Sequence, residues 1–153
     1  MSALELKIPP VMLTLLFVLL MWLVSRLTPS FPVPLEPRIL SLLLLTGVGT
    51  YVGLAAVATF KKARTTVNPF TPDASSSLVA SGIFRRSRNP MYLALIIVLL
   101  GWGLYLANLF SLFIAAGFVL YMNRFQIQPE ERALEESFGT EFLDYKKRVR
   151  RWI

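Results

Sequence analysis

The chain has 153 residues, enough for one domain, and 55% of them are hydrophobic, with a mean hydropathy of +0.59. This hydropathy is well above that of soluble globular domains. The absence of cysteine excludes disulfides, thiolate nucleophiles and sulfur-ligated metals, and the absence of histidine removes the commonest general base and the imidazole ligands of most metal sites. We therefore expect no metal centre, and any chemistry must use carboxylates, arginines, tyrosines, backbone groups or a reactive cofactor.

Two uncharged runs in the first half of the chain predict membrane-spanning helices. They begin at Ile8 and Ile39 and contain 18 and 22 residues, each close to the ~20 residues that cross ~30 Å of hydrocarbon. We place these spans at about 9–25 and 39–60. The first run has neither a basic leader nor a small-residue cleavage site, so we interpret it as an anchor and not as a signal peptide.

A third uncharged run, residues 89–123, predicts two further spans. Its 35 residues would form a single helix about 52 Å long at ~1.5 Å per residue, which is too long for one crossing. Folded at Asn108, the run gives spans at about 90–107 and 109–124, joined by a very tight turn. The expected fold is therefore all-α: one polytopic membrane domain, residues 1–153, with four transmembrane helices.

The distribution of basic residues predicts how the spans are oriented. Of the 16 lysines and arginines, 14 fall before the first span, between the second and third spans, or after the fourth. Because basic residues favour the cytosolic side, both termini and the loop at 61–88 are predicted to be cytosolic. A basic face also attracts anionic lipid headgroups. Nucleic acid is not an expected partner, because no recognition motif accompanies the charge.

The predicted cytosolic segments differ in character. Residues 61–88 are rich in turn-forming residues, and a long loop held between two spans can act as a lid over a pocket. Residues 129–150 predict a helical region on the membrane surface, beginning at Pro129 and divided or kinked at Gly139. The apolar stripe of this region has helical spacing. Its members are Leu134, Phe138, Phe142, Tyr145, Val149 and Trp152.

The polar segment before the third span is a candidate anion site. Asn89 is placed to cap the helix and Pro90 suits its first position. A helix N-terminus offers unpaired N–H groups to carboxylates, and Arg88 adds a forked donor beside it. Arginines beside capped spans are also ordinary membrane anchors, so this segment alone does not specify a ligand.

A pair of carboxylates, Glu130 and Glu131, follows the fourth span by only a few residues. The tight turn at Asn108 returns the chain to the side from which the third span starts, so the pair and the segment around Arg88 can line one cleft. Carboxylates suit an ammonium or sulfonium group, while the arginine and helix terminus suit a carboxylate. S-adenosylmethionine carries all of these groups.

The order Arg88-Asn89-Pro90-Met91-Tyr92, hydrophobic hairpin and Glu130-Glu131 resembles the membrane methyltransferases that include isoprenylcysteine carboxyl methyltransferases and phospholipid N-methyltransferases. The resemblance covers about residues 60–153. It implies S-adenosylmethionine as cofactor, with Arg88 and Glu130 in catalysis. The residues that it implies for cofactor binding are Arg88, Asn89, Met91, Tyr92, Glu130 and Glu131.

The resemblance leaves the acceptor open between a prenylcysteine-type carboxylate and the amine of a phospholipid headgroup. Asn89 stands where isoprenylcysteine enzymes usually have histidine and is more similar to the phospholipid enzymes. A hydrophobic acceptor is expected to enter from the bilayer. The same resemblance implies that this bilayer is a bacterial inner membrane. Two alternatives remain: a membrane reductase of sterol-reductase-like fold that uses NADPH, and a non-enzymatic scaffold that binds anionic lipid.

Overall fold

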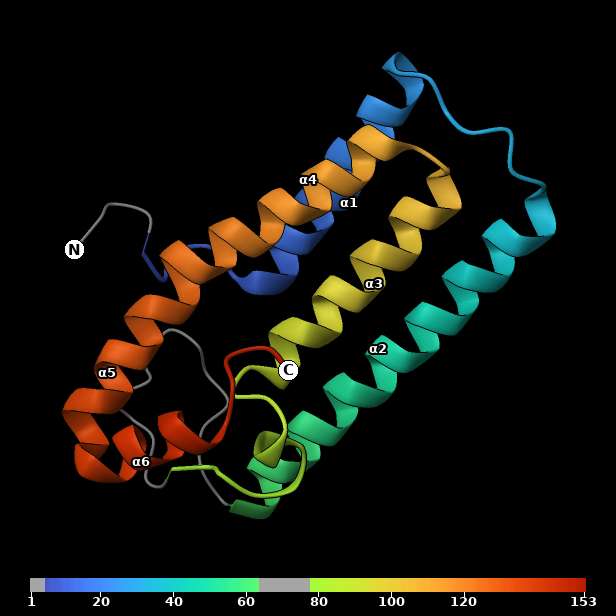
Figure 1. The fold of residues 1–153 in the computed structure, drawn as a ribbon. Coiled ribbons are helices and arrows are strands. Elements are labelled where there is room, and N and C mark those ends of the chain that lie inside the picture. Colours follow the sequence, from blue (N-terminus) through green and yellow to red (C-terminus); the bar gives the residue numbers. More distant parts are fainter. Residues whose placement is uncertain (1–4, 64–77) are drawn as a thin grey trace.

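The computed structural model describes residues 5–63 and 78–153, and every regular element within these ranges is helical (Figure 1). The all-α expectation is therefore confirmed for the described part of the chain. The elements are α1 (Pro10–Leu27), α2 (Leu35–Ala63), the 3-10 helix η2 (Gly82–Arg85), α3 (Pro90–Leu106), α4 (Leu109–Tyr121), the π-helical η3 (Met122–Ile127), α5 (Gln128–Phe138) and α6 (Thr140–Arg148).

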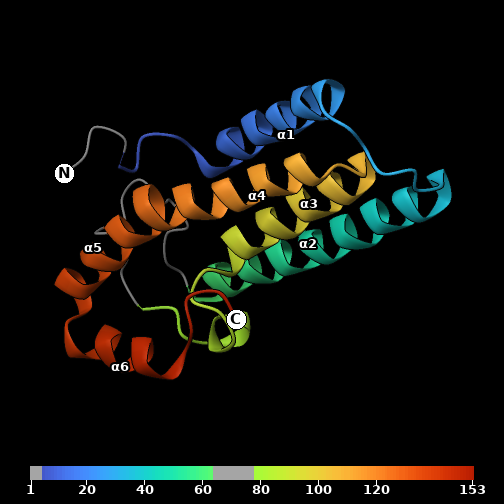
Figure 2. The same cartoon turned by 45° about the horizontal axis from the view of Figure 1, so that its top comes forward.

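The four long apolar helices lie side by side in the order α1, α4, α3, α2, as the turned view in Figure 2 shows. α3 contacts α1, α2 and α4, whereas α2 packs mainly against α3. The start of α1, the C-terminus, α5 and α6 lie at one end of this layer, which we call the α5–α6 end (Figure 1). The α1–α2 connection and the short α3–α4 turn lie at the opposite end.

Three helices are long and apolar enough to cross a membrane: α1, α2 and the continuous helix Leu109–Phe138. α3 is also apolar but has 17 residues, so three or four helices have the character of membrane spans. α2 is longer than the predicted 39–60 at both ends. The predicted loop at 61–88 begins with the last turn of α2 and contains η2, and its section 64–77 lies outside the described residues.

The predicted break between the fourth span and the surface helix is wrong. We expected the span to end near 124 and a new helix to begin at Pro129, but the helix runs through η3 into α5 without interruption. A proline in a helix removes one N–H donor and crowds the carbonyl four residues earlier, here that of Phe125. This carbonyl accepts a hydrogen bond of 3.1 Å from the Leu6 amide instead. The wider π turn and this substitute donor together accommodate Pro129 inside the helix.

The predicted division at Gly139 is confirmed. Gly139 has a φ of +50°, in the left-handed region that favours glycine, and separates α5 from α6. The chain turns here, so α6 runs back beneath the other helices at the α5–α6 end (Figure 2). This turn brings Tyr145 of α6 to η2, where its hydroxyl bonds the carbonyl of Phe84.

At the other end, Asn108 joins three parts of the chain. Its side-chain oxygen caps α4 by accepting from the Ser111 amide at 2.9 Å, and its Nδ2 donates to Thr28 Oγ1 at 2.8 Å and to the Pro29 carbonyl at 3.0 Å. Asn108 is buried. Asn108, at which the third uncharged run was predicted to fold, therefore also ties the end of α1 to the start of α4.

α2 and α3 approach each other most closely at a glycine. A Cβ at Gly49 would lie 2.8 Å from Val98 Cγ2 and 2.9 Å from the carbonyl oxygen of Ala94. Backbone cannot move aside as a flexible side chain can, so this position requires glycine for packing. Gly47, one half-turn away, has nothing within 4 Å of the same hypothetical atom.

We expect Gly49→Ala to lower the free energy of unfolding by about 1–3 kcal/mol, because overpacking forces the two helices apart. Gly47→Ala adds the same methyl group to the same helix and serves as the control. Thermal unfolding of the detergent-solubilised protein measures both. Equal melting temperatures for the two variants would contradict the close α2–α3 contact.

Candidate functional site

A cavity of about 650 Å³ lies between the start of α3, the middle of α2, and helices α5 and α6. This volume is within the range of roughly 300–1,000 Å³ typical of small-molecule sites. All six residues proposed from the sequence line it: Arg88, Asn89, Met91, Tyr92, Glu130 and Glu131. The tertiary structure thus brings the two halves of the sequence pattern to one place.

The two ends of the cavity differ in polarity. Its polar end is formed by the start of α3 and by Glu130 and Glu131 of α5, and its apolar end lies between α2 and α3. Val11 and Leu54 line it although their side chains are largely exposed. The cavity is therefore open on the surface of the helical layer. The apolar lining includes Gly49, Gly53, Val57, Ala94, Leu95 and Val98.

Glu130 takes part in a three-membered hydrogen-bond group with Tyr92 and Gln126. The Tyr92 hydroxyl and the Gln126 Nε2 both donate to Glu130 Oε1, the latter at 2.6 Å, and Gln126 also approaches the Tyr92 hydroxyl at 3.4 Å. Sequence analysis missed Gln126. The only signal for it was a polar residue on an otherwise apolar face, four positions before Glu130.

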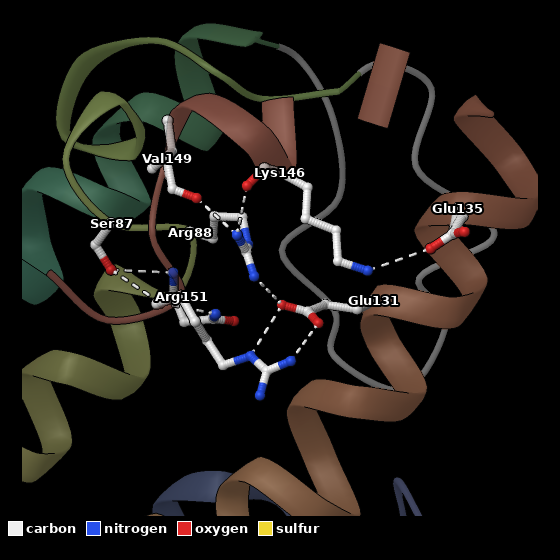
Figure 3. A network of polar contacts seen from close by, with 8 residues as sticks. Ser87, Arg88, Glu131, Glu135, Lys146, Val149 and Arg151 are labelled. Atoms are coloured by element: carbon white, nitrogen blue, oxygen red, sulfur yellow. Dashed lines mark hydrogen bonds and ion pairs between the residues drawn. The ribbon is translucent and has the colours of Figure 1, made fainter. Parts of the chain in front are cut away.

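Glu131 is held by two arginines, as Figure 3 shows. Its Oε1 accepts from Arg88 Nη2 at 2.8 Å and from Arg151 Nε at 3.1 Å, and its Oε2 accepts from Arg151 Nη2 at 2.6 Å. The carboxylate is only 7% exposed. Two guanidinium groups therefore compensate for the desolvation of one buried carboxylate.

Arg88 also connects α3 to the end of α6. Its Nη1 donates to the carbonyls of Lys146 at 3.1 Å and Val149 at 2.6 Å (Figure 3). These carbonyls lie at a helix C-terminus, where positive charge is favoured. Most of the guanidinium thus bonds within the protein, while its Nε is buried without a partner among the described residues.

The predicted capping role of the Asn89 side chain is wrong. Asn89 makes no side-chain cap to α3; its Nδ2 donates to the carbonyl of Arg151 at 3.1 Å. The cause is the C-terminal segment, which runs beside residues 87–89 and bonds the Arg88 amide through the Arg150 carbonyl at 3.0 Å. Ser87 Oγ accepts from the Asn89 amide at 3.1 Å.

Tyr145 of α6 closes the site against η2. Its buried hydroxyl donates to the carbonyl of Phe84 at 2.7 Å. Burial raises the pKa of the Tyr145 hydroxyl to about 12, so the group stays protonated and remains a donor at neutral pH. Tyr145 and Phe142 together form an aromatic wall of the cavity.

The profile of a known family, described as phospholipid methyltransferase, matches residues 38–141, from the start of α2 to the start of α6. The chain belongs to the phospholipid methyltransferase family. An uncharacterized protein of Haemophilus influenzae is 46% identical over 63 residues, which are 41% of this chain and the whole of that protein. No solved structure matches the chain.

Both halves of the candidate site, around Arg88 and at Glu130 and Glu131, fall within the matched residues 38–141. The matched region ends before Arg151, the residue that supplies two of the three hydrogen bonds to Glu131. The C-terminal segment that completes this network thus lies beyond the family match.

We expect Glu131→Gln to destabilise the protein by about 3–5 kcal/mol, because it leaves the Arg88 guanidinium buried without a counter-charge. The control is Glu136→Gln on the same helix, where the side chain is exposed. Thermal unfolding measures stability, and limited trypsin cleavage at the C-terminal arginines reports release of the segment. Unchanged melting and cleavage in Glu131→Gln would contradict the role of this ion pair.

Proposed function

We propose that this phospholipid methyltransferase family member transfers the methyl group of S-adenosylmethionine to a hydrophobic, lipid-like acceptor in this cavity. The observation that carries the proposal is the two-part cavity: charged and polar side chains line one end, and an open apolar groove between α2 and α3 forms the other. Such a site can accommodate a polar cofactor and the tail of a lipid at once.

The polar end fits the groups of S-adenosylmethionine. Glu130 has a second oxygen, Oε2, without a hydrogen bond within the described ranges, and a carboxylate suits an ammonium or sulfonium group. Arg88 Nε is a buried donor without a partner there, and the first N–H groups of α3 have no partner within the helix. These donors suit a carboxylate. When bound, the cofactor supplies an electrophilic methyl group.

The apolar groove supports a chain-like acceptor. The groove is lined by residues with little or no side chain, Gly49, Gly53 and Ala94, which leave room for a chain. Exposed Leu54 lies at its mouth. Because the groove opens between two apolar helices, an acceptor can enter laterally from the bilayer while its reactive head reaches Glu130. A phospholipid amine and a prenylcysteine-type carboxylate both match this arrangement.

The chain's own residues would contribute to methyl transfer in two ways. The aromatic wall of Phe142 and Tyr145 excludes water, and the Tyr92–Glu130 pair orients the reacting head. An amine acceptor must lose a proton before it reacts, and Glu130 is the carboxylate in position to accept it. A carboxylate acceptor needs no base.

The distribution of charge supports a cytosolic site. The α5–α6 end carries the basic C-terminal segment, residues 146–151, whereas Arg26 and Arg38 lie at the ends of α1 and α2 that meet the opposite connection (Figure 1). By the preference of basic residues for the inner side, we propose that the cavity faces the cytosol of a bacterial inner membrane, where soluble cofactor is supplied.

We expect S-adenosylhomocysteine to raise the melting temperature of the solubilised wild-type protein. Glu130→Gln should weaken its binding at least about tenfold, since a charge-assisted hydrogen bond contributes roughly 1.5–3 kcal/mol. Glu136→Gln is the control with the same change on the exposed face. If S-adenosylhomocysteine leaves the melting temperature unchanged and the protein is retained on immobilised NADPH, the proposal of methyl transfer is contradicted and the reductase alternative is favoured.

We expect Leu54→Trp to reduce transfer of labelled methyl to a bacterial lipid extract at least about tenfold, because the indole fills the mouth of the groove. Binding of S-adenosylhomocysteine should stay unchanged, since Leu54 lies at the apolar end. Leu44→Trp, at another exposed leucine of α2, is the control. Equal transfer by both variants would place the acceptor elsewhere.

A further inference from the structure

The π-helical segment η3 interrupts the regular α-helical spacing of the long helix. On α4 the buried positions Ser111, Ala115 and Phe118 lead to buried Met122 at spacings of four, three and four. Continued at 3.6 residues per turn, this face would return near 129 and 133. Pro129 is buried as this spacing predicts, but Gln126, Ile127 and Glu131 are buried as well, and Glu130, Glu131 and Leu134 line the cavity. A π turn holds more residues than an α turn, and both Gln126 and Ile127 lie within it.

The segment containing Glu5 and Leu6 holds this unusual turn in place. The Leu6 amide bonds the Phe125 carbonyl, and Glu5 accepts from Arg124 Nη1 at 3.1 Å and from Arg132 Nη2 at 2.9 Å. The two arginines lie on either side of the end of η3, so one buried carboxylate joins both sides of the turn. The π geometry is therefore fixed by tertiary contacts outside the helix.

The turn places Gln126 in the wall behind Glu130. Gln126 is 3% exposed, and its side-chain Nε2 donates to two groups of the site, Glu130 Oε1 and the Tyr92 hydroxyl. The single proton of the Tyr92 hydroxyl is donated to Glu130, which leaves a lone pair to accept from Gln126. Gln126 thus lies against both polar groups without lining the cavity itself.

We propose that Gln126 is a positioning residue that fixes the orientation of the Glu130 carboxylate, with Oε1 bound to the protein and Oε2 directed to the ligand. The last torsion of a glutamate is broad and roughly two-fold. One donor from Tyr92 would leave the plane of the carboxylate free to rotate over a wide range. A second donor, approaching the same oxygen from another side chain, narrows that range, and Gln126 is that donor. The proposal rests on the proposed function for the identity of the ligand.

The test is a double-mutant cycle on the full chain in detergent, with S-adenosylhomocysteine affinity measured by titration calorimetry. Gln126→Leu keeps the size of the side chain and removes its donor, and Glu130→Leu removes the group that it positions. We expect Gln126→Leu to weaken binding about tenfold in the wild-type background and not at all in Glu130→Leu. Gln128→Leu, whose side chain lines an outer groove beside Arg132, should bind as wild type.

Independent losses that multiply in the double variant, or full affinity in Gln126→Leu, would overturn the positioning role. Tyr92→Phe, which removes only the hydroxyl, provides a second partner for the cycle if Glu130→Leu does not fold. If wild type binds no S-adenosylhomocysteine, the proposed function fails separately. The melting temperatures of the same variants without ligand then test the contact between Gln126 and Glu130. Non-additive changes in the double variant support this contact, and additive changes overturn it.

Discussion

The buried ion pair between Arg88 and Glu131 is the contact on which the rest of the site depends. It joins the start of α3 to α5, and through Nη1 of Arg88 it also holds the end of α6. Arg151 brings the C-terminal segment to the same carboxylate. Four stretches of chain therefore converge on one pair of charges, and three of them, the start of α3, α5 and α6, line the cavity.

Two adjacent carboxylates have opposite surroundings because successive residues of a helix point about 100° apart. Glu131 faces two guanidinium groups and is a structural anion. Glu130 faces a phenol and an amide, which are neutral donors, and one of its oxygens remains without a partner in the described part of the chain. A doubled acidic motif can thus supply one group that builds the site and another that serves the ligand.

The membrane explains how so small a chain has room for a cavity of this size. A soluble enzyme of this size would need most of its apolar side chains for a core, whereas here lipid covers the outward faces of α1 and α2. Close approach of α2 and α3 at Gly49 then creates a groove beside the contact, open to the hydrocarbon. The charged and polar side chains of the candidate site are confined to the α5–α6 end.

The sequence by itself determined the helical class, the apolar spans, the division at Gly139 and the family, because hydrophobic runs and a paired motif are local signals. It also identified six of the residues that line the cavity. Only the tertiary structure decided that the helix continues through Pro129, since the substitute donor comes from Leu6. Only the tertiary structure likewise decided that the Asn89 side chain bonds the carbonyl of Arg151 in the C-terminal segment. In both places the deciding partner lies far away in the chain, and no local pattern encodes it.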